Sequence, residues 1–179
     1  MNLLALSGSL RADSTNTALL QAAAREAPDG VICQVFEDLP DVPLFSPDRD
    51  ATRPVPLAVA SLREAVASAD GLVIACPEYA HGIPGAFKNA LDWIVGSNEM
   101  TDKPVMLLAA SLPPRGLLLR EALLEVLGAM SARVIDCGVA VPLIGRKPAE
   151  CAALLANAAT RASLRQSLGR FVTAIRSIA

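Results

Sequence analysis

The sequence predicts an α/β protein with an open, doubly wound parallel sheet. Along 179 residues, short aliphatic runs alternate with longer amphipathic segments about five times. The short runs are continuously apolar, which is typical of parallel strands whose two faces are both covered by helices. A barrel of eight βα units would need a longer chain. Because the length suits one domain and no linker or repeat interrupts the pattern, residues 1–179 are expected to form a single domain.

The first βαβ unit is expected in the N-terminal third of the chain. Asn2–Ser7 is an aliphatic run followed by glycine and serine, as in a strand that leads into a turn. Ser14–Ala27 carries alanine and leucine at helical spacing, with threonine and asparagine near its start as candidate caps. Val31–Phe36 is the second predicted strand. The proline- and aspartate-rich segment Glu37–Pro54 is expected to be a long irregular loop, either functional or a simple surface excursion.

Two further strand–helix pairs are expected in the middle of the chain. The helix Val55–Ala69 precedes Gly71–Cys76, an apolar run expected to be a fully buried strand. After a turn rich in glycine and proline, Gly85–Val95 is expected to be a helix, because its apolar residues fall on one face. Val105–Ala110 is then the next central strand, and Leu117–Met130 is the next helix.

The C-terminal part of the chain is expected to supply the last strand and a long helical segment. Ala132–Asp136 and Val139–Val141 together are expected to form the fifth strand. Ala149–Ile178 is expected to be mostly helical, with a break near Ser163. The predicted sheet therefore has five strands.

Composition excludes several classes of protein. The chain is 53% hydrophobic, which excludes disorder. No uncharged stretch is longer than Pro104–Pro114, which is far shorter than the roughly 20 residues of a membrane-spanning helix. The net charge is −2 and no lysine- or arginine-rich run occurs, so neither nucleic acid nor an anionic membrane is an expected partner. Four scattered cysteines and a single histidine predict no metal site. Together with the lack of a basic N-terminal leader, the cysteines favour a reducing, cytoplasmic location.

The loop after the first strand has the composition of a phosphate-binding site. Ligands of open parallel sheets bind at the carboxyl ends of the strands, where free backbone N–H groups and the helix dipole attract anions. Here hydroxyl and amide side chains surround one arginine, Arg11: Ser9, Ser14, Thr15, Asn16 and Thr17. The alternative is an ordinary capped helix with a solvated arginine, although capping alone needs only one such residue. Motifs for nucleoside triphosphates and for dinucleotides are absent.

The loop after the third strand, Cys76–Gly85, has a rigid backbone that could border a planar heterocycle. Two prolines and two glycines constrain it and expose successive N–H groups. It contains the only tyrosine, Tyr79, and the only histidine, His81. Tyr79 could instead cover an apolar surface, and Glu78 could be a solvated turn residue. For His81 a solvent-exposed turn position is favoured over acid–base catalysis, because nothing in the sequence indicates a catalytic triad.

The chain resembles the NADPH-dependent FMN reductases, a family of flavodoxin-like fold that includes quinone, azo-dye and chromate reductases. The resemblance rests on two motifs: Gly8-Ser9-Leu10-Arg11 followed by Ser14-Thr15-Asn16, and Pro77-Glu78-Tyr79 through Gly82-Ile83-Pro84-Gly85 to Lys88-Asn89-Ala90-Leu91-Asp92-Trp93. It implies a three-layer α/β/α sandwich, with strand order 2-1-3-4-5, that forms one FMN-binding domain.

The resemblance also implies a set of cofactor-binding residues. The FMN phosphate would be held by Ser9, Arg11, Ser14, Thr15 and Asn16 together with nearby backbone amides. The isoalloxazine ring would be bordered by a second set: Pro77, Glu78, Tyr79 and the Ala80–His81 backbone, where the family commonly has a pair such as Asn-Gly. In the loop after the fourth strand, Ser111 is a candidate flavin contact, while Pro113 and Pro114 remove two N–H donors.

A polar face on the helix Gly85–Val95 is a candidate subunit contact. Lys88, Asn89, Asp92 and Trp93 are expected to lie opposite the apolar face of this helix. They could form a solvated face around a partly buried tryptophan. The resemblance instead implies a homodimer or homotetramer whose flavin pocket is shared between subunits, and an exposed Trp93 would favour this, since tryptophan is enriched at interfaces.

The activity that the resemblance implies is two-electron reduction. FMN would accept a hydride at N5 from NADPH or NADH and pass two electrons to a small acceptor such as a quinone, a flavin, an azo dye or chromate, with ping-pong kinetics and no catalytic side chain. A one-electron carrier of the same fold is the first alternative, although such carriers are usually acidic and cover the flavin with aromatic rings. A non-catalytic, flavin-dependent interaction protein is the second alternative.

Overall fold

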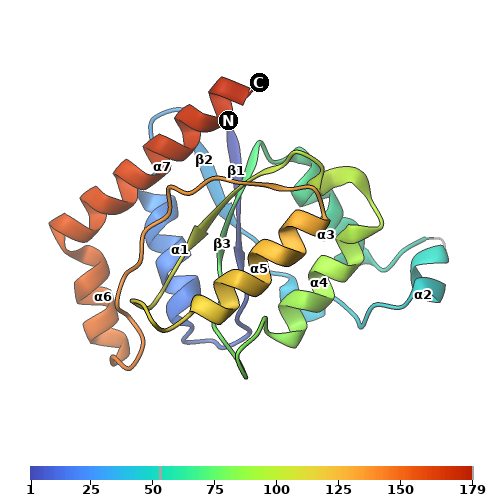
Figure 1. Cartoon of the computed structure of the whole chain (residues 1–179), viewed down its shortest axis with the longest axis horizontal. Helices are drawn as coiled ribbons and strands as arrows, with labels where there is room; N and C mark the ends of the chain where they lie inside the picture. Colours follow the sequence, from blue (N-terminus) through green and yellow to red (C-terminus); the bar gives the residue numbers. More distant parts are fainter. Residues whose placement is uncertain (53, 179) are drawn as a thin grey trace.

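The computed structural model describes residues 1–52 and 54–178 and has a parallel five-stranded sheet at its centre (Figure 1). The strand order is β2-β1-β3-β4-β5, as predicted. The strands are β1 (Asn2–Ser7), β2 (Ile32–Val35), β3 (Gly71–Ala75), β4 (Pro104–Leu108) and β5 (Arg133–Val134). The order reverses direction between β1 and β3, so the loops after these two strands lie at the topological switch point where such sheets bind ligands.

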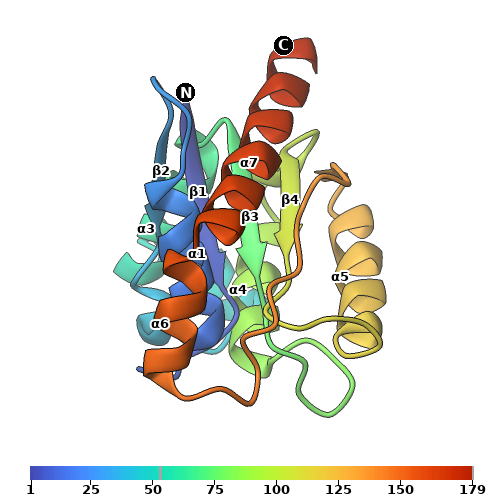
Figure 2. The same ribbon diagram turned by 90° about the vertical axis from the view of Figure 1, so that its left-hand side faces the viewer.

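Helices cover both faces of the sheet (Figures 1 and 2). One face carries α1 (Thr15–Arg25), α6 (Pro148–Ala156) and α7 (Ala158–Ile178). The other face carries α3 (Leu57–Ser68), α4 (Gly85–Val95) and α5 (Leu117–Ala129). Three short helices lie in connecting segments: η1 (Leu39–Asp41), α2 (Pro47–Ala51) and η2 (Asn98–Met100). The predicted three-layer sandwich is confirmed.

Successive residues of the central strands belong to two separate apolar cores. In β1, Leu3 and Ala5 pack with α1 and α7, while Leu4 and Leu6 pack with the helices of the opposite face. This division follows from the twofold alternation of side chains along a strand. It explains why β1 and β3 read as continuous apolar runs, since both of their faces are buried.

Several boundaries differ from the prediction. Ser14 is the cap of α1: its Oγ accepts from the Thr17 N–H at 3.2 Å, so the cap is a serine rather than a threonine or asparagine. The last strand is reduced to two residues of β5 and a single bridge between Ala109 and Ala140. The break expected near Ser163 lies instead at Asn157, whose extended backbone ends α6 and whose Oδ1 accepts from the Ala159 N–H.

The expected exposure of Trp93 is wrong. Its side chain is fully buried under the irregular segment before α2, where Nε1 donates to the Pro43 carbonyl at 2.7 Å and the ring packs edge-on against Phe45. Asn89 fastens the same segment through hydrogen bonds to the Pro43 carbonyl and the Phe45 N–H. Within the predicted polar face, Lys88 and Asp92 are partly exposed and form an ion pair. The long proline-rich segment is thus a cover for α4, and its residue 53 lies outside the described residues.

A buried carboxylate joins the end of α1 to α7. Glu26 is 4% exposed and accepts hydrogen bonds from Arg161 and Arg165. The hydrogen bond from Arg161 is the main reason why the pKa of Glu26 lies below its ordinary value of 4.5. A carboxylate whose pKa is lower in the folded protein than in the unfolded chain stabilises the fold at pH values above the unfolded-state pKa. This stabilisation is lost as the pH falls through the folded-state pKa.

We expect Glu26→Gln to lower the melting temperature at pH 7 and to have a smaller effect at pH 3. At the lower pH, the wild-type carboxylate is losing its charge and with it the advantage over glutamine. Thermal unfolding of both proteins between pH 3 and 7 measures the difference. A gap that stays constant across this range would contradict the assigned role of the charge.

Candidate functional site

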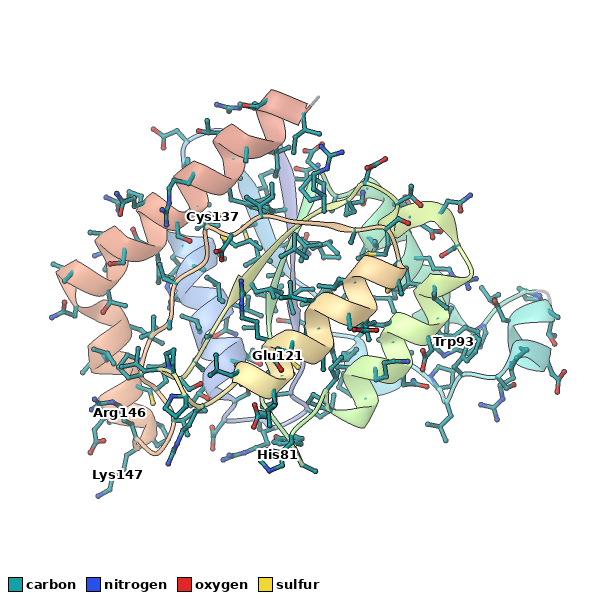
Figure 3. The ribbon with its side chains drawn as sticks, in the orientation of Figure 1. His81, Trp93, Glu121, Cys137, Arg146 and Lys147 are labelled. Carbon is teal, nitrogen blue, oxygen red and sulfur yellow. The ribbon has the colours of Figure 1, made fainter. Side chains whose placement is uncertain are left out.

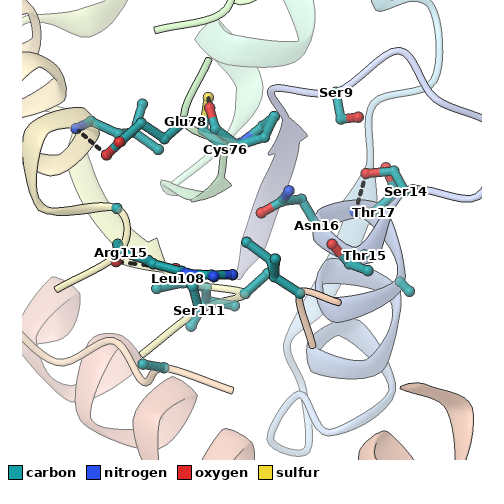
Figure 4. A pocket seen from close by; sticks show the side chains of 18 of the residues that line it. Ser9, Ser14, Thr15, Asn16, Thr17, Cys76, Glu78, Leu108, Ser111 and Arg115 are labelled. Atoms are coloured by element: carbon teal, nitrogen blue, oxygen red, sulfur yellow. Dashed lines mark hydrogen bonds between the residues drawn. The ribbon is translucent and has the colours of Figure 1, made fainter. Parts of the chain in front are cut away.

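A large cavity opens at the carboxyl edge of the sheet, at the position that the switch point predicts (Figure 4). Its volume is about 1360 Å³. The loops after β1, β3 and β4 line it, together with the segment between β5 and α6. This is larger than the roughly 300–1,000 Å³ of a typical small-molecule pocket, so the cavity has room for more than one ligand.

The loop after β1 is held in a fixed shape that leaves the start of α1 facing the cavity. Gly8 lies so close to β3 that a Cβ there would sit 2.1 Å from Cys76 Sγ, so only glycine fits. Hydroxyl groups fix the rest of the turn, since Ser7 bonds Thr17 at 2.7 Å and Ser9 accepts from the Arg11 N–H. Such a helix start presents free N–H groups and a positive dipole end, which together suit a phosphate.

Asn16 supplies an unpaired polar group at this helix start. It is only 3% exposed, and its Oδ1 has no hydrogen-bond partner among the described residues. In Figure 4 its amide projects from α1 toward the cavity. A buried amide oxygen without a partner costs about 1–3 kcal/mol, so the arrangement is explained if a ligand supplies the missing hydrogen bond.

The loop after β3 forms a tight two-residue turn at the edge of the cavity. Tyr79 and Gly82 are paired by two backbone hydrogen bonds of 3.2 and 3.0 Å. The two residues between them, Ala80 and His81, have φ values of 49° and 63°. Such a turn favours Asn-Gly, which is the type of pair that the resemblance gives for these positions. His81 lies at the lower edge in Figure 3, and its side chain is 80% exposed.

The Glu78 carboxylate lies between the turn and the start of α5 and contacts both. Its Oε2 accepts from the Leu119 N–H at 3.1 Å, at the start of α5, and its Oε1 lies 3.4 Å from His81 Nδ1. The residue before α5, Gly116, has no side chain to cap the helix, so Glu78 provides that cap from another loop. Glu78 therefore fixes the loop after β3 against the loop after β4.

The loop after β4 places an unpaired arginine on the cavity wall. Ser111 is buried, and its Oγ donates to the Arg115 carbonyl at 3.2 Å, which closes the loop. Pro113, which belongs to the loop after the buried end of β4, also lines the cavity. The guanidinium of Arg115 makes no hydrogen bond or ion pair with the described residues, and in Figure 4 this arginine belongs to the wall across from Ser14 and Thr15.

The fourth wall comes from the segment between β5 and α6, for which the sequence predicted no site residues. Gly138 crosses β4 so closely that a Cβ would lie 1.8 Å from the Leu107 carbonyl oxygen. Beyond it, Ile144 and Arg146 line the cavity, and Leu155 of α6 completes the wall. The rule that ligands bind at strand carboxyl ends, applied to the fifth strand as well, would have located this segment.

Cys76 is a structural cysteine although it lines the cavity. Burial raises the pKa of its thiol to about 12. A thiol with this pKa stays protonated at neutral pH and is a poor nucleophile. The chemistry of the cavity therefore does not depend on a cysteine thiolate at this position.

Most of the predicted site residues meet in this one cavity. The residues that line it are Ser9, Arg11, Ser14, Thr15, Asn16, Pro77, Glu78, Tyr79 and Ser111. Ala80 and His81 are not part of the lining, because the turn carries them outward. The lining residues that the sequence analysis missed include Arg115, Arg120, Asp136 and Arg146. Arg115 had a detectable signal, since it is a cation in a loop that follows a predicted strand.

The family profile and two relatives that match this chain are all reductases. The sequence profile described as NADPH-dependent FMN reductase matches residues 1–144. An NADH:(hydroxy)cinnamate reductase subunit of Vibrio ruber is 41% identical over 112 residues, which is 62% of this chain and 54% of that protein. A quinone reductase of Escherichia coli K12 is 32% identical over 114 residues, 63% of this chain and 61% of that protein. The chain thus spans between half and two thirds of the length of these relatives.

Solved structures share the fold over the whole chain. A flavoenzyme NAD(P)H:(acceptor) oxidoreductase from Paracoccus denitrificans has a TM-score of 0.78 and 23% sequence identity, and the match covers 98% of this chain and 97% of the other. An NADH:FMN oxidoreductase in its apo form has a TM-score of 0.69 and 20% identity, covering 97% and 89% of the two chains. At these identities the likeness concerns the fold.

Proposed function

Because the chain belongs to the NADPH-dependent FMN reductase family, we propose that it is an FMN-dependent oxidoreductase that uses NADPH or NADH to reduce quinones or similar acceptors. The observation that carries the proposal is the cavity at the switch point, with a helix start and an unpaired buried amide on one side. The names of the relatives, which include quinone reductases, support the class of acceptor.

The residues at the start of α1 fit the phosphate and ribityl chain of FMN. Arg11 can donate two parallel hydrogen bonds to phosphate oxygens, and the first N–H groups of α1 can donate to the same dianion. The Ser9 and Thr15 hydroxyls line the same part of the cavity. The Asn16 amide can both donate to a phosphate oxygen and accept from a ribityl hydroxyl, which would satisfy its unpaired Oδ1.

The loops after β3 and β4 would hold the edge of the ring. Pro77 and Tyr79 line the cavity, and Glu78 fixes their loop to the start of α5. When bound, FMN supplies the ring that takes a hydride from the nicotinamide and passes two electrons to the acceptor. Since the described residues bring one aromatic side chain, Tyr79, to the cavity, a face of the ring stays open to a second ligand.

The proposal is tested by the colour and the reduction of the purified protein. We expect a yellow protein whose absorbance is bleached by NADPH without oxygen and restored by a quinone, according to NAD(P)H + H⁺ + quinone → NAD(P)⁺ + hydroquinone. Initial rates at several quinone concentrations should give parallel double-reciprocal lines. A protein that fails to bind added FMN would overturn the proposal. A stable one-electron state on photoreduction would favour an electron carrier, and FMN binding without any NAD(P)H oxidation would favour an interaction protein.

We expect Arg11→Ala to weaken FMN binding about tenfold while riboflavin binding stays unchanged, because Arg11 would contact only the phosphate. The side chain is exposed and makes no hydrogen bond with the described residues, so the stability of the flavin-free protein should not change. Fluorescence titration with each flavin measures the affinities. Arg25→Ala, at the other end of α1, is the matched control. Equal losses for FMN and riboflavin would show that Arg11 does not bind the phosphate.

We also propose that the chain is a single FMN-binding domain that works as a homodimer or homotetramer in a reducing, cytoplasmic compartment. Exposed leucines on α5, Leu117, Leu118 and Leu124, support a subunit contact, whereas the buried Trp93 does not. Four unpaired cysteines support the reducing location. Analytical ultracentrifugation of the purified protein tests the assembly.

Among the described residues no helix combines the length and the apolar character needed to cross a bilayer.

A further inference from the structure

One wall of the cavity combines an apolar surface with several arginines. Val139, Ile144 and Leu155 provide aliphatic side chains, and Arg115, Arg120 and Arg146 lie among them. This wall comes from the loop after β4 and from the segment that follows β5. Its last part, from residue 145 onward, lies outside the residues that the family profile matches.

Two of these arginines keep free donor groups. Arg120 is neutralised by Asp136, which its Nη2 contacts at 3.0 Å. Arg146 uses only its Nε, which donates to the Pro142 carbonyl at 2.7 Å and fixes the side chain. Arg115 makes no hydrogen bond or ion pair with the described residues. Positive charge therefore remains uncompensated on this wall, and an anion that enters beside the flavin would meet it.

The phosphate of the cofactor does not account for Arg115. The phosphate-binding groups gather at the start of α1, around Arg11 and Asn16, whereas Arg115 belongs to the facing wall in Figure 4. The volume of about 1360 Å³ leaves space for a second ligand there. A guanidinium suits an oxyanion, and the aliphatic residues of the wall suit a flat apolar body.

We propose that Arg115 and Arg146 form a subsite for electron acceptors that carry an acidic group on a planar apolar body, such as a carboxylate, a sulfonate or an ionised hydroxyl on a quinone ring. The inference rests on the proposed function. The acidic group stays unchanged in the reaction: the quinone gains two electrons and two protons, while NAD(P)H loses a hydride. The arginines would position the acceptor and favour it over a neutral one, without contributing to proton transfer.

The test compares 1,4-naphthoquinone with 1,4-naphthoquinone-2-sulfonate in the flavin-loaded protein. In Arg115→Gln/Arg146→Gln, kcat/KM for the sulfonate should fall about tenfold or more, while kcat/KM for the neutral quinone should change less than about twofold. The Lys substitutions at both positions, which keep the charge, should restore part of the loss. Arg176→Gln, an exposed arginine far along α7, is the control. Calorimetric binding of naphthalene-2-sulfonate, which is not reduced, should weaken in parallel.

The same variants distinguish the acceptor from the dinucleotide. In a ping-pong reaction kcat/KM for NADPH is measured independently of kcat/KM for the acceptor. If the double variant loses NADPH efficiency and keeps that for the sulfonate, the arginines serve the dinucleotide phosphates and the inference is wrong. Equal losses for both quinones would also overturn it. A wild-type protein that lacks FMN or is not reduced by NADPH contradicts the proposed function, whereas a reducible protein without charge preference contradicts this inference alone.

Discussion

Replacement of Asn16 by leucine should weaken FMN binding by about 10- to 150-fold and stabilise the flavin-free protein. The first effect corresponds to the roughly 1.5–3 kcal/mol of a hydrogen bond to a charged group. The second effect follows from the unpaired Oδ1, which is buried without a partner among the described residues. Leucine has the same branched skeleton as asparagine and removes that penalty, so we expect a gain of about 1 kcal/mol, or roughly 2–4 °C in melting temperature.

Opposite signs in the two measurements separate a ligand-binding role from a packing role. A residue that only packs would lower stability and affinity together when it is replaced. Asn16→Asp is the second variant: it keeps the shape but places a carboxylate beside the phosphate dianion, so it should bind FMN more weakly than Asn16→Leu does. Titration with FMN and thermal unfolding without flavin give both quantities. A flavin-free protein destabilised by leucine would mean that Oδ1 has a partner.

The phosphate side of the cavity could be predicted from the sequence because its signal is local. Ser9, Arg11, Ser14 and Asn16 are close together in the chain, and a strand followed by a helix brings them to one place whatever the rest of the fold does. The same holds for the two-sided burial of β1 and β3, since continuous apolar runs are a property of each segment. The strand order, in contrast, was implied by the family resemblance.

The features that were missed depend on contacts between distant segments. Trp93 was expected at the surface because it lies opposite the apolar face of its helix, but Pro43 and Phe45 cover it from about fifty residues away. Glu78 joins the loop after β3 to α5 through the Leu119 N–H, and this contact has no sequence pattern. Arg146 reaches the cavity only because the segment after β5 folds back across β4. Such long-range contacts are set by tertiary packing, which local patterns do not record.

Replacement of Gly138 by alanine should have the largest effect on stability. The added Cβ would lie 1.8 Å from the Leu107 carbonyl oxygen and 2.9 Å from its carbonyl carbon, both of which are backbone atoms of β4. A backbone obstacle cannot move aside as a side-chain end can, so the segment after β5 must shift. Overpacking of this kind costs about 3 kcal/mol or more, which corresponds to a fall of roughly 6–12 °C in melting temperature.

The segment after β5 also forms hydrogen bonds with the residue that follows β4. Val139 accepts a hydrogen bond from the Ala109 N–H at 3.1 Å, and the Val141 N–H donates to the Ala109 carbonyl at 2.8 Å. Both bonds must lengthen if Gly138 moves off β4. Because Gly138 and Val139 line the cavity, the wall that carries Arg146 shifts as well, and we expect any FMN-loaded variant to lose its preference for the sulfonated quinone.

Gly128→Ala is the matched control for this substitution. Gly128 lies inside α5, and nothing beyond its chain neighbours and the backbone of its own helix comes within 4 Å of the added Cβ. Alanine there should therefore stabilise the protein by about 0.5–1 kcal/mol through helix propensity. Thermal unfolding of the two variants compares the same chemical change in an open and in a closed site. If Gly138→Ala unfolds within 2 °C of Gly128→Ala, on the scale of roughly 2–4 °C per kcal/mol, the segment after β5 does not pack tightly on β4. The cavity wall would then have no fixed support.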